Sequence, residues 1–138
     1  MIERYVDTAI ANLLRTISGL QVYEGLQDNE PPLETPYCAV FSNVTEISGR
    51  LPVYGLLTTI EYVTVSGQDV ATNVIDVMTQ IDNLIGPGAD YSGTIQTPGL
   101  SGCRWQAIGR SEQQVGDRRI IIRELTVKAT MTPQTQTV

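Results

Sequence analysis

Two segments of the chain repeat apolar residues at the three- and four-residue spacing of an amphipathic helix. The first runs from Ile2 to Ile17 and is followed by Gly19, a residue type that commonly ends helices. The second runs from Asp69 to Ile85, with a carboxylate at its start and Gly86-Pro87-Gly88 after its end. Because each segment is apolar along one stripe only, we expect both helices to pack that stripe against a shared core.

Other segments are rich in β-branched and aromatic residues, or alternate apolar and polar side chains as strands do. The five predicted strands are Leu20 to Tyr23, Tyr37 to Ile47, Leu56 to Val65, Cys103 to Ser111 and Arg118 to Met131. The last two form a closing hairpin around Glu112 to Asp117. The order α-β-β-β-α-β-β predicts an α+β fold in which two helices pack on one face of a mainly antiparallel sheet.

The length of 138 residues suits a single core, so we expect one α+β domain over residues 1–132 and a polar tail over residues 133–138. The segment from Glu24 to Pro36 is acidic and proline-rich and is predicted to be a loop. The segment from Gly86 to Gly102 is also predicted to be a loop. A connection of that length in a compact domain indicates disorder or contact with a partner.

Apolar residues also lie in the predicted connection from Ser48 to Gly55, which carries Leu51, Val53 and Tyr54. Side chains at a hairpin tip are poorly placed to reach the core of their own domain. Burial against another subunit is one interpretation of these three residues, and simple packing at the tip is the other.

Charge is distributed unevenly along the chain, whose net charge is −6. Ten acidic residues and one basic residue lie between Thr16 and Cys103, whereas six basic and three acidic residues lie between Arg104 and Lys128. This distribution predicts a negative part of the fold and a positive late strand pair, through which copies could attract one another head to tail. The alternative is that these charges only solvate the surface. The acidic balance argues against general binding to nucleic acid or to a membrane surface.

Five arginines in the late segment, with Trp105 among them, could grip an acidic protein surface, could be solvated strand charges, or could form a DNA site. The protein contact is the functional interpretation we carry forward. The candidate interface residues are Leu51, Val53, Tyr54, Arg104, Arg110, Arg118, Arg119, Arg123, Asp28, Glu30 and Glu34.

Reactive side chains are scarce in this sequence. It has no histidine and one lysine, and its two cysteines, Cys38 and Cys103, have neither metal-binding nor redox spacing, so we interpret them as buried strand residues. The nearest pair of carboxylates, Asp28 and Glu30, lies in the acidic loop. We therefore expect no enzyme activity, no cofactor and no metal site. No apolar run has membrane-spanning length and no signal peptide is recognisable, so we expect synthesis in the cytoplasm without membrane contact.

The layout of the chain resembles that of the tail completion or tail terminator proteins of long-tailed bacteriophages. The resemblance spans nearly the whole chain. Its carriers are the helix Ile2 to Ile17, the run Leu20-Gln21-Val22-Tyr23-Glu24-Gly25, the loop ending in Thr35-Pro36-Tyr37, the helix Val70 to Leu84, and the segment from Trp105 through Arg118-Arg119 to Met131.

This resemblance implies a virion protein of the phage neck. Such a protein forms a ring, typically of six copies, that caps the tail tube, stops its polymerisation and offers the surface on which the head docks. The implied partners are further copies of the chain, the tail tube protein and the head–tail connector protein, and DNA would pass through the lumen without specific binding. Three other hypotheses stay open. One is another neck or tail component, such as a head-completion connector or minor tail protein, the second is a small ligand-binding regulatory domain, and the third is an enzyme that acts through carboxylates alone, with Asp28 and Glu30 as its residues.

Overall fold

One sheet of five strands runs through the part of the chain that the computed structural model describes, residues 2–25, 36–49, 53–65, 71–86 and 99–131. The elements are α1 (Ile2–Leu14), β1 (Val22–Glu24), β2 (Tyr37–Ser48), β3 (Val53–Val65), α2 (Ala71–Ile85), β4 (Leu100–Val115) and β5 (Arg118–Met131). The strand order is β1-β2-β3-β5-β4, with β1 parallel to β2 and the other neighbours antiparallel. The predicted α+β class and element order are confirmed.

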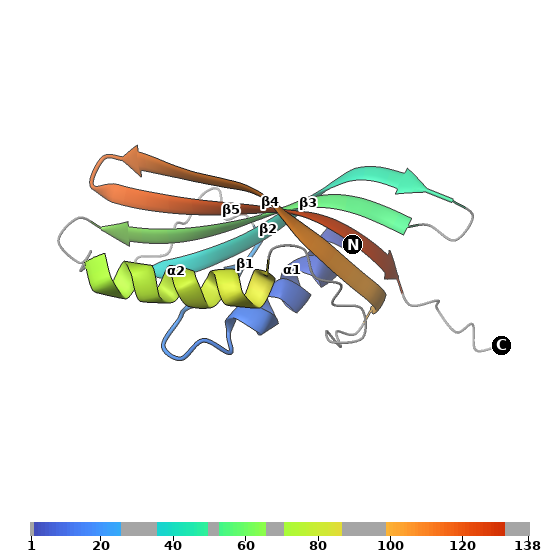
Figure 1. Cartoon of the computed structure of the whole chain (residues 1–138). Helices are drawn as coiled ribbons and strands as arrows, with labels where there is room; N and C mark the ends of the chain where they lie inside the picture. The colour runs from blue at the N-terminus through green and yellow to red at the C-terminus, as the bar shows by residue number, and fades with distance from the viewer. Residues whose placement is uncertain (1, 26–35, 50–52, 66–70, 87–98, 132–138) are drawn as a thin grey trace.

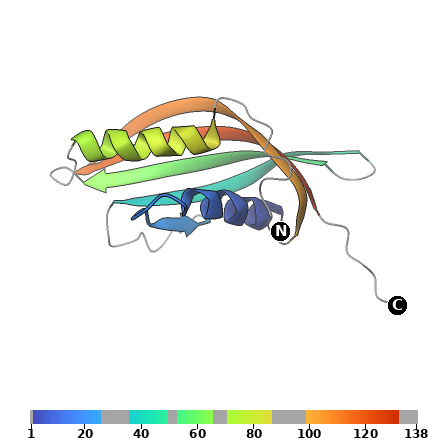
Figure 2. The ribbon, with the colours of Figure 1, turned by 60° about the horizontal axis from the view of Figure 1, so that its bottom comes forward.

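Both helices lie on the same face of the sheet, as predicted (Figure 1). Figure 2 looks toward that face and shows α1 over the β1–β2 side and α2 over the β4–β5 side. The even-numbered residues of β3 from Leu56 to Tyr62 point toward the helices, and Leu56, Thr58 and Ile60 are almost completely buried. Leu56 and Ile60 join the apolar stripe of α1, which includes Val6, Ile10 and Leu14, in one core.

The first helix is shorter than its sequence pattern suggests. It ends at Leu14, and the chain then turns through Gly19, whose φ is +79°. The Leu13 carbonyl of the last turn accepts both the backbone N–H of Thr16, at 3.2 Å, and the Thr16 hydroxyl, at 2.7 Å. Ile17 stays buried even though it lies beyond the helix, which explains why it extended the apolar periodicity.

The second helix is fixed to the sheet at its C-terminal end. The indole N–H of Trp105 on β4 donates to the carbonyl of Ile85, the last residue of α2, at 3.0 Å. Gly86 follows with a φ of +62°, the left-handed conformation that commonly ends a helix. Because Trp105 is buried, this bond satisfies two polar groups that would otherwise be desolvated without a partner.

The strands are longer than predicted at several ends. β3 begins at Val53 rather than Leu56, because Val53 and Tyr54 continue the register with both β2 and β5. β4 covers Leu100–Val115 rather than Cys103 to Ser111, and the pairing passes Gly102 and Gly109 through two register shifts. The closing turn shrinks to Gly116 and Asp117, and Gly116 takes a positive φ of 63°.

The two long hairpins extend from opposite ends of the sheet (Figure 1). The β2–β3 hairpin leaves one end, and the β4–β5 hairpin leaves the other end beside the start of α2. Each end therefore presents a different surface to a neighbouring molecule. The predicted tail over residues 133–138 lies outside the described residues.

Candidate subunit interface

The five arginines predicted to form one contact are divided between the two faces of the sheet. Cross-strand register and strand alternation place Arg104 and Arg118 on the face that the helices leave uncovered. Arg110, Arg119 and Arg123 lie on the helical face, where Arg110 and Arg119 are on the hairpin beside α2. The late segment therefore does not form a single positive patch.

Arg123 is held by a carboxylate of its own chain. Its Nε lies 2.9 Å from Asp82 Oδ1 on α2, and its Nη2 lies 3.4 Å from Asp82 Oδ2, so the guanidinium meets both carboxylate oxygens. Its Nη1 also donates to the Ile122 carbonyl at 3.1 Å. The Arg123 side chain is only 12% exposed. This ion pair ties α2 to β5 and is a structural contact of the monomer.

Two further ion pairs reduce the charge asymmetry predicted from the sequence. Arg119 pairs with Glu112 across the β4–β5 hairpin, and Lys128 on β5 pairs with Glu46 on β2. The second pair spans β3, where Gly55 lies between the two residues in register. A Cβ atom at Gly55 would fall 2.6 Å from Glu46 Cγ, so the glycine makes room for the carboxylate side chain. The hydrogen bond from Lys128 lowers the pKa of Glu46.

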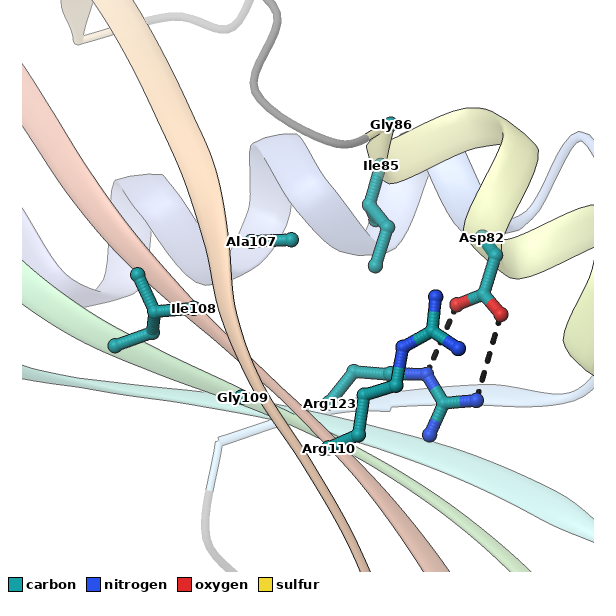
Figure 3. A pocket seen from close by; sticks show the side chains of 8 residues that line it. All are labelled: Asp82, Ile85, Gly86, Ala107, Ile108, Gly109, Arg110 and Arg123. Atoms are coloured by element: carbon teal, nitrogen blue, oxygen red, sulfur yellow. Dashed lines mark hydrogen bonds and ion pairs between the residues drawn. The ribbon is translucent and has the colours of Figure 1, made fainter.

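Arg110 differs from these residues because no ion pair is found for it among the described residues. It lines two adjoining cavities, of about 520 and 370 Å³, between α2 and β4–β5, and both cavities also share Arg123. Figure 3 shows the Arg110 guanidinium beside that of Arg123, with only Arg123 joined to Asp82. We call these two cavities together the α2–β4 groove.

The predicted apolar tip is only partly described. Leu51, like the acidic residues Asp28, Glu30 and Glu34, lies outside the described residues. Val53 and Tyr54 are half-buried in β3, and Tyr54 packs against the core, so it does reach the core of its own domain. The most exposed large apolar residue at this end is Ile47, which is 64% exposed and which the sequence pattern placed inside a strand.

The face of the sheet opposite the helices is another feature that sequence analysis did not single out. Among the described residues no helix covers it (Figure 1). The Tyr23 and Tyr37 rings meet edge to face with centroids 5.8 Å apart, and Val63 and Ile122 are buried on this side. Glu61 lies among them, and burial raises its pKa. Alternation within β3 is the signal that could have identified this face.

A buried polar cluster lies under α1. Asp7 is 6% exposed, and its Oδ1 has no hydrogen-bond partner among the residues that the structure describes. Burial raises the pKa of Asp7 to about 6, a hydrogen bond from Ser42 opposes the shift, and the charges of Glu24 and Glu3 add to it. Ser42 in turn shares a 2.7 Å hydrogen bond with Thr58.

The two cysteines are unpaired and buried, as expected from the sequence. Burial raises the pKa of Cys38 to about 12 and that of Cys103 to about 11, so neither thiol ionises at neutral pH. The described residues contain no group of three or more metal-ligating side chains. Within the same residues, neither helix is long and apolar enough to cross a membrane.

No protein-family model and no curated protein sequence matches this chain. Solved structures do. One is a chain of the virion of a native gene transfer agent particle, which aligns with a TM-score of 0.63 and 18% identity over 92% of this chain and 94% of that chain. A second, which carries no functional description, aligns with a TM-score of 0.61 and 15% identity over 94% of both chains. These likenesses establish that the whole described fold recurs in other proteins.

Proposed function

We propose that this protein is a structural component of a bacteriophage-like virion. The observation that carries the proposal is the likeness to a chain of a gene transfer agent virion, which covers nearly the full length of both chains. The alignment spans nearly the whole of each chain, so the likeness is not limited to a common sheet motif. The scarcity of reactive side chains in the sequence supports a role in assembly over one in catalysis.

Within the virion we propose the role of a tail terminator, a subunit of a ring that caps the tail tube and offers the head-docking surface. The resemblance in sequence layout supports this role, and the structure adds two ends of different character. A ring requires a heterologous interface, in which one surface of a copy meets a different surface of the next. A hexamer would bind the tail tube protein on one side and the head–tail connector protein on the other.

The lumen of such a ring would have to let DNA pass. Six copies with a net charge of −6 carry about −36 together. Carboxylates facing the lumen would repel phosphate and prevent the genome from adhering, whereas a positive lumen would retain it. Our candidates for contacts with neighbouring copies or with the partner rings are Asp28, Glu30 and Glu34, the exposed Arg104, the half-buried Arg118, and the hairpin residues Leu51, Val53 and Tyr54.

The test is to locate and count the protein. We expect closed rings of six copies by native mass spectrometry and negative-stain electron microscopy, either for the free protein or after it is mixed with tail tubes. On tails, antibody or gold labelling should mark the head-proximal end only. Single copies along the side of the tube would contradict the terminator role, and labelling on the portal side would favour a head-completion connector.

A further inference from the structure

The α2–β4 groove contains one more cation than carboxylate. Among the described residues it holds Arg110, Arg119 and Arg123 against Asp82 and Glu112. Arg123 and Arg119 use the two carboxylates. Arg110 is directly opposite Arg123 in the β4–β5 register, and like charges in that arrangement destabilise a strand pair. An additional carboxylate beside Arg110 would remove this repulsion.

Apolar side chains lie on either side of this cation. Ile75 on α2 is 64% exposed and Ile108 on β4 is 55% exposed, and both line the groove. Deeper in the groove lie Met78 and Ile85. Isolated exposed hydrophobic residues are ordinary. Here two of them flank an arginine that has no ion pair with any described residue, and such a surface suits a protein segment that carries an apolar and an acidic residue.

Such a segment lies at the other end of the sheet. Ile47 on β2 is 64% exposed, and Glu46 precedes it in the chain. The register places Glu46 on the uncovered face of the sheet and Ile47 on the helical face, so the two side chains leave the strand in opposite directions. Glu46 pairs with Lys128, but the Glu46 side chain is 57% exposed and the Lys128 side chain is 40% exposed. Ion pairs as exposed as this one contribute little free energy, so Glu46 can exchange its partner at small cost.

The groove cannot receive this segment from the same chain. Ile47 pairs with Tyr54, which pairs with Ala129, which pairs with Cys103 on β4. Ile108 therefore lies three strand positions across the sheet from Ile47 and five residues further along β4. The spacing of strands and the rise per residue in a sheet place the two residues roughly 20 Å apart. A second copy must supply the hairpin, and the resulting contact joins two different surfaces.

We propose that the edge of β2 at Glu46 and Ile47 of one copy enters the α2–β4 groove of the next, so that Glu46, on one face of the strand, meets Arg110 and Ile47, on the other face, packs between Ile75 and Ile108. This inference rests on the proposed ring function and assigns residues to its subunit contact. It is heterologous, as ring closure requires. Three of the four most exposed large hydrophobic residues of the described chain take part in it.

Disulfide trapping tests the geometry. In the double variant Ile47→Cys, Ile108→Cys, mild oxidation of assembled protein should give a ladder of covalent oligomers up to the full ring. Each single variant should give no ladder. The two native cysteines are buried and should not interfere. An intrachain disulfide is excluded because bridged Cα atoms lie within about 7 Å. Rings that assemble without yielding the ladder would overturn the proposal.

Charge exchange tests the energetics. Arg110→Glu and Glu46→Arg should each raise the concentration needed for ring assembly about tenfold or more, and the double variant should restore assembly. Arg4→Glu, which changes an exposed arginine of α1 by the same charge, is the matched control and should assemble like the wild type. Folding is checked by thermal melting of each variant.

These experiments distinguish a failure of the proposed ring function from a failure of the proposed groove contact. If wild-type protein forms no ring, alone or on tails, the terminator role is wrong. If the wild type forms rings and Arg110→Glu leaves them unchanged, or the exchange fails to restore them, the groove contact is wrong and the ring function stands.

Discussion

Asp7 gives the sharpest prediction about the monomer, because its carboxyl group is buried and forms no ion pair within the described part of the chain. Burial raises its pKa from 3.8 to about 6. A pKa that differs by about two between the folded and unfolded states corresponds to about 3 kcal/mol of folding free energy. We predict that Asp7→Asn stabilises the protein at pH 8 by up to that amount, because the variant has no charge to bury.

The sign follows from proton binding. Below about pH 4 Asp7 is protonated in both states and carries no penalty. Between pH 4 and 6 the unfolded chain loses this proton while the folded chain keeps it, so the contribution of Asp7 to stability falls as the pH rises. Above pH 6 the carboxylate is ionised in both states, and the full penalty remains. The stability gained by Asp7→Asn should therefore grow from pH 4 to pH 6 and then stay constant.

The assay is urea unfolding followed by the fluorescence of Trp105, the single tryptophan, which is buried. The free energies of unfolding of wild type and Asp7→Asn are compared from pH 4 to pH 8. An unsatisfied amide hydrogen at the new Asn would cost about 1 kcal/mol at every pH. This cost does not affect how the difference in unfolding free energy between the variant and the wild type changes with pH. Asp76→Asn on the exposed side of α2 is the control and should change stability by less than about 0.5 kcal/mol. A pH-independent difference for Asp7→Asn would refute the reasoning.

Three further predictions concern the contacts that hold the helices and the hairpin. Trp105→Phe removes the hydrogen bond to the Ile85 carbonyl and should cost about 1–3 kcal/mol in urea unfolding followed by circular dichroism. Asp82→Asn leaves Arg123 without its counter-ion and should lower the unfolding free energy by about 1–3 kcal/mol. Adding 0.5 M salt to the wild type should not cause the same loss, because salt screens a largely buried ion pair only weakly. Gly55→Ala should displace Glu46 from Lys128, so that the pKa of Glu46, followed by NMR titration, returns toward its ordinary value. If the pKa of Glu46 in that variant stays as low as in the wild type, the strand accommodates the methyl group and the prediction is wrong.

Most of the fold could be predicted because its two periodicities are clear in the sequence. The helical spacing of Val6, Ile10 and Leu14, and the alternation of Leu125, Val127 and Ala129, each correspond to side chains that are buried in the core. Element ends were less predictable. Ile17 lies in a turn yet is buried, and Val53 lies in a segment that looks like a loop because glycine and proline surround it.

The candidate interface was harder to predict because it depends on long-range pairing. Asp82 and Arg123 are 41 residues apart in sequence and only the packing of α2 on β5 joins them. Counting alternately from the buried residues Cys103 and Trp105 would place Arg110 on the uncovered face of the sheet. The register shift between Ala107 and Gly109 moves it to the helical face instead. Gly109 is the only local sign of that shift, and a glycine in a strand has several possible meanings.

The same register shift connects the fold to the proposed assembly. Without it Arg110 would project from the uncovered face, and Arg123 with Asp82 would form a complete, neutral pair inside the groove. With it, Arg110 lies opposite Arg123 while only Arg123 is bonded to Asp82, and a neighbouring copy can relieve the resulting repulsion between the two guanidinium groups. Assembly would then be favoured because it removes the repulsion between Arg110 and Arg123 that is present in the monomer. Because a charged contact of this kind weakens with salt, ring assembly should require higher protein concentration as ionic strength rises, and Arg110→Gln should remove most of that salt dependence.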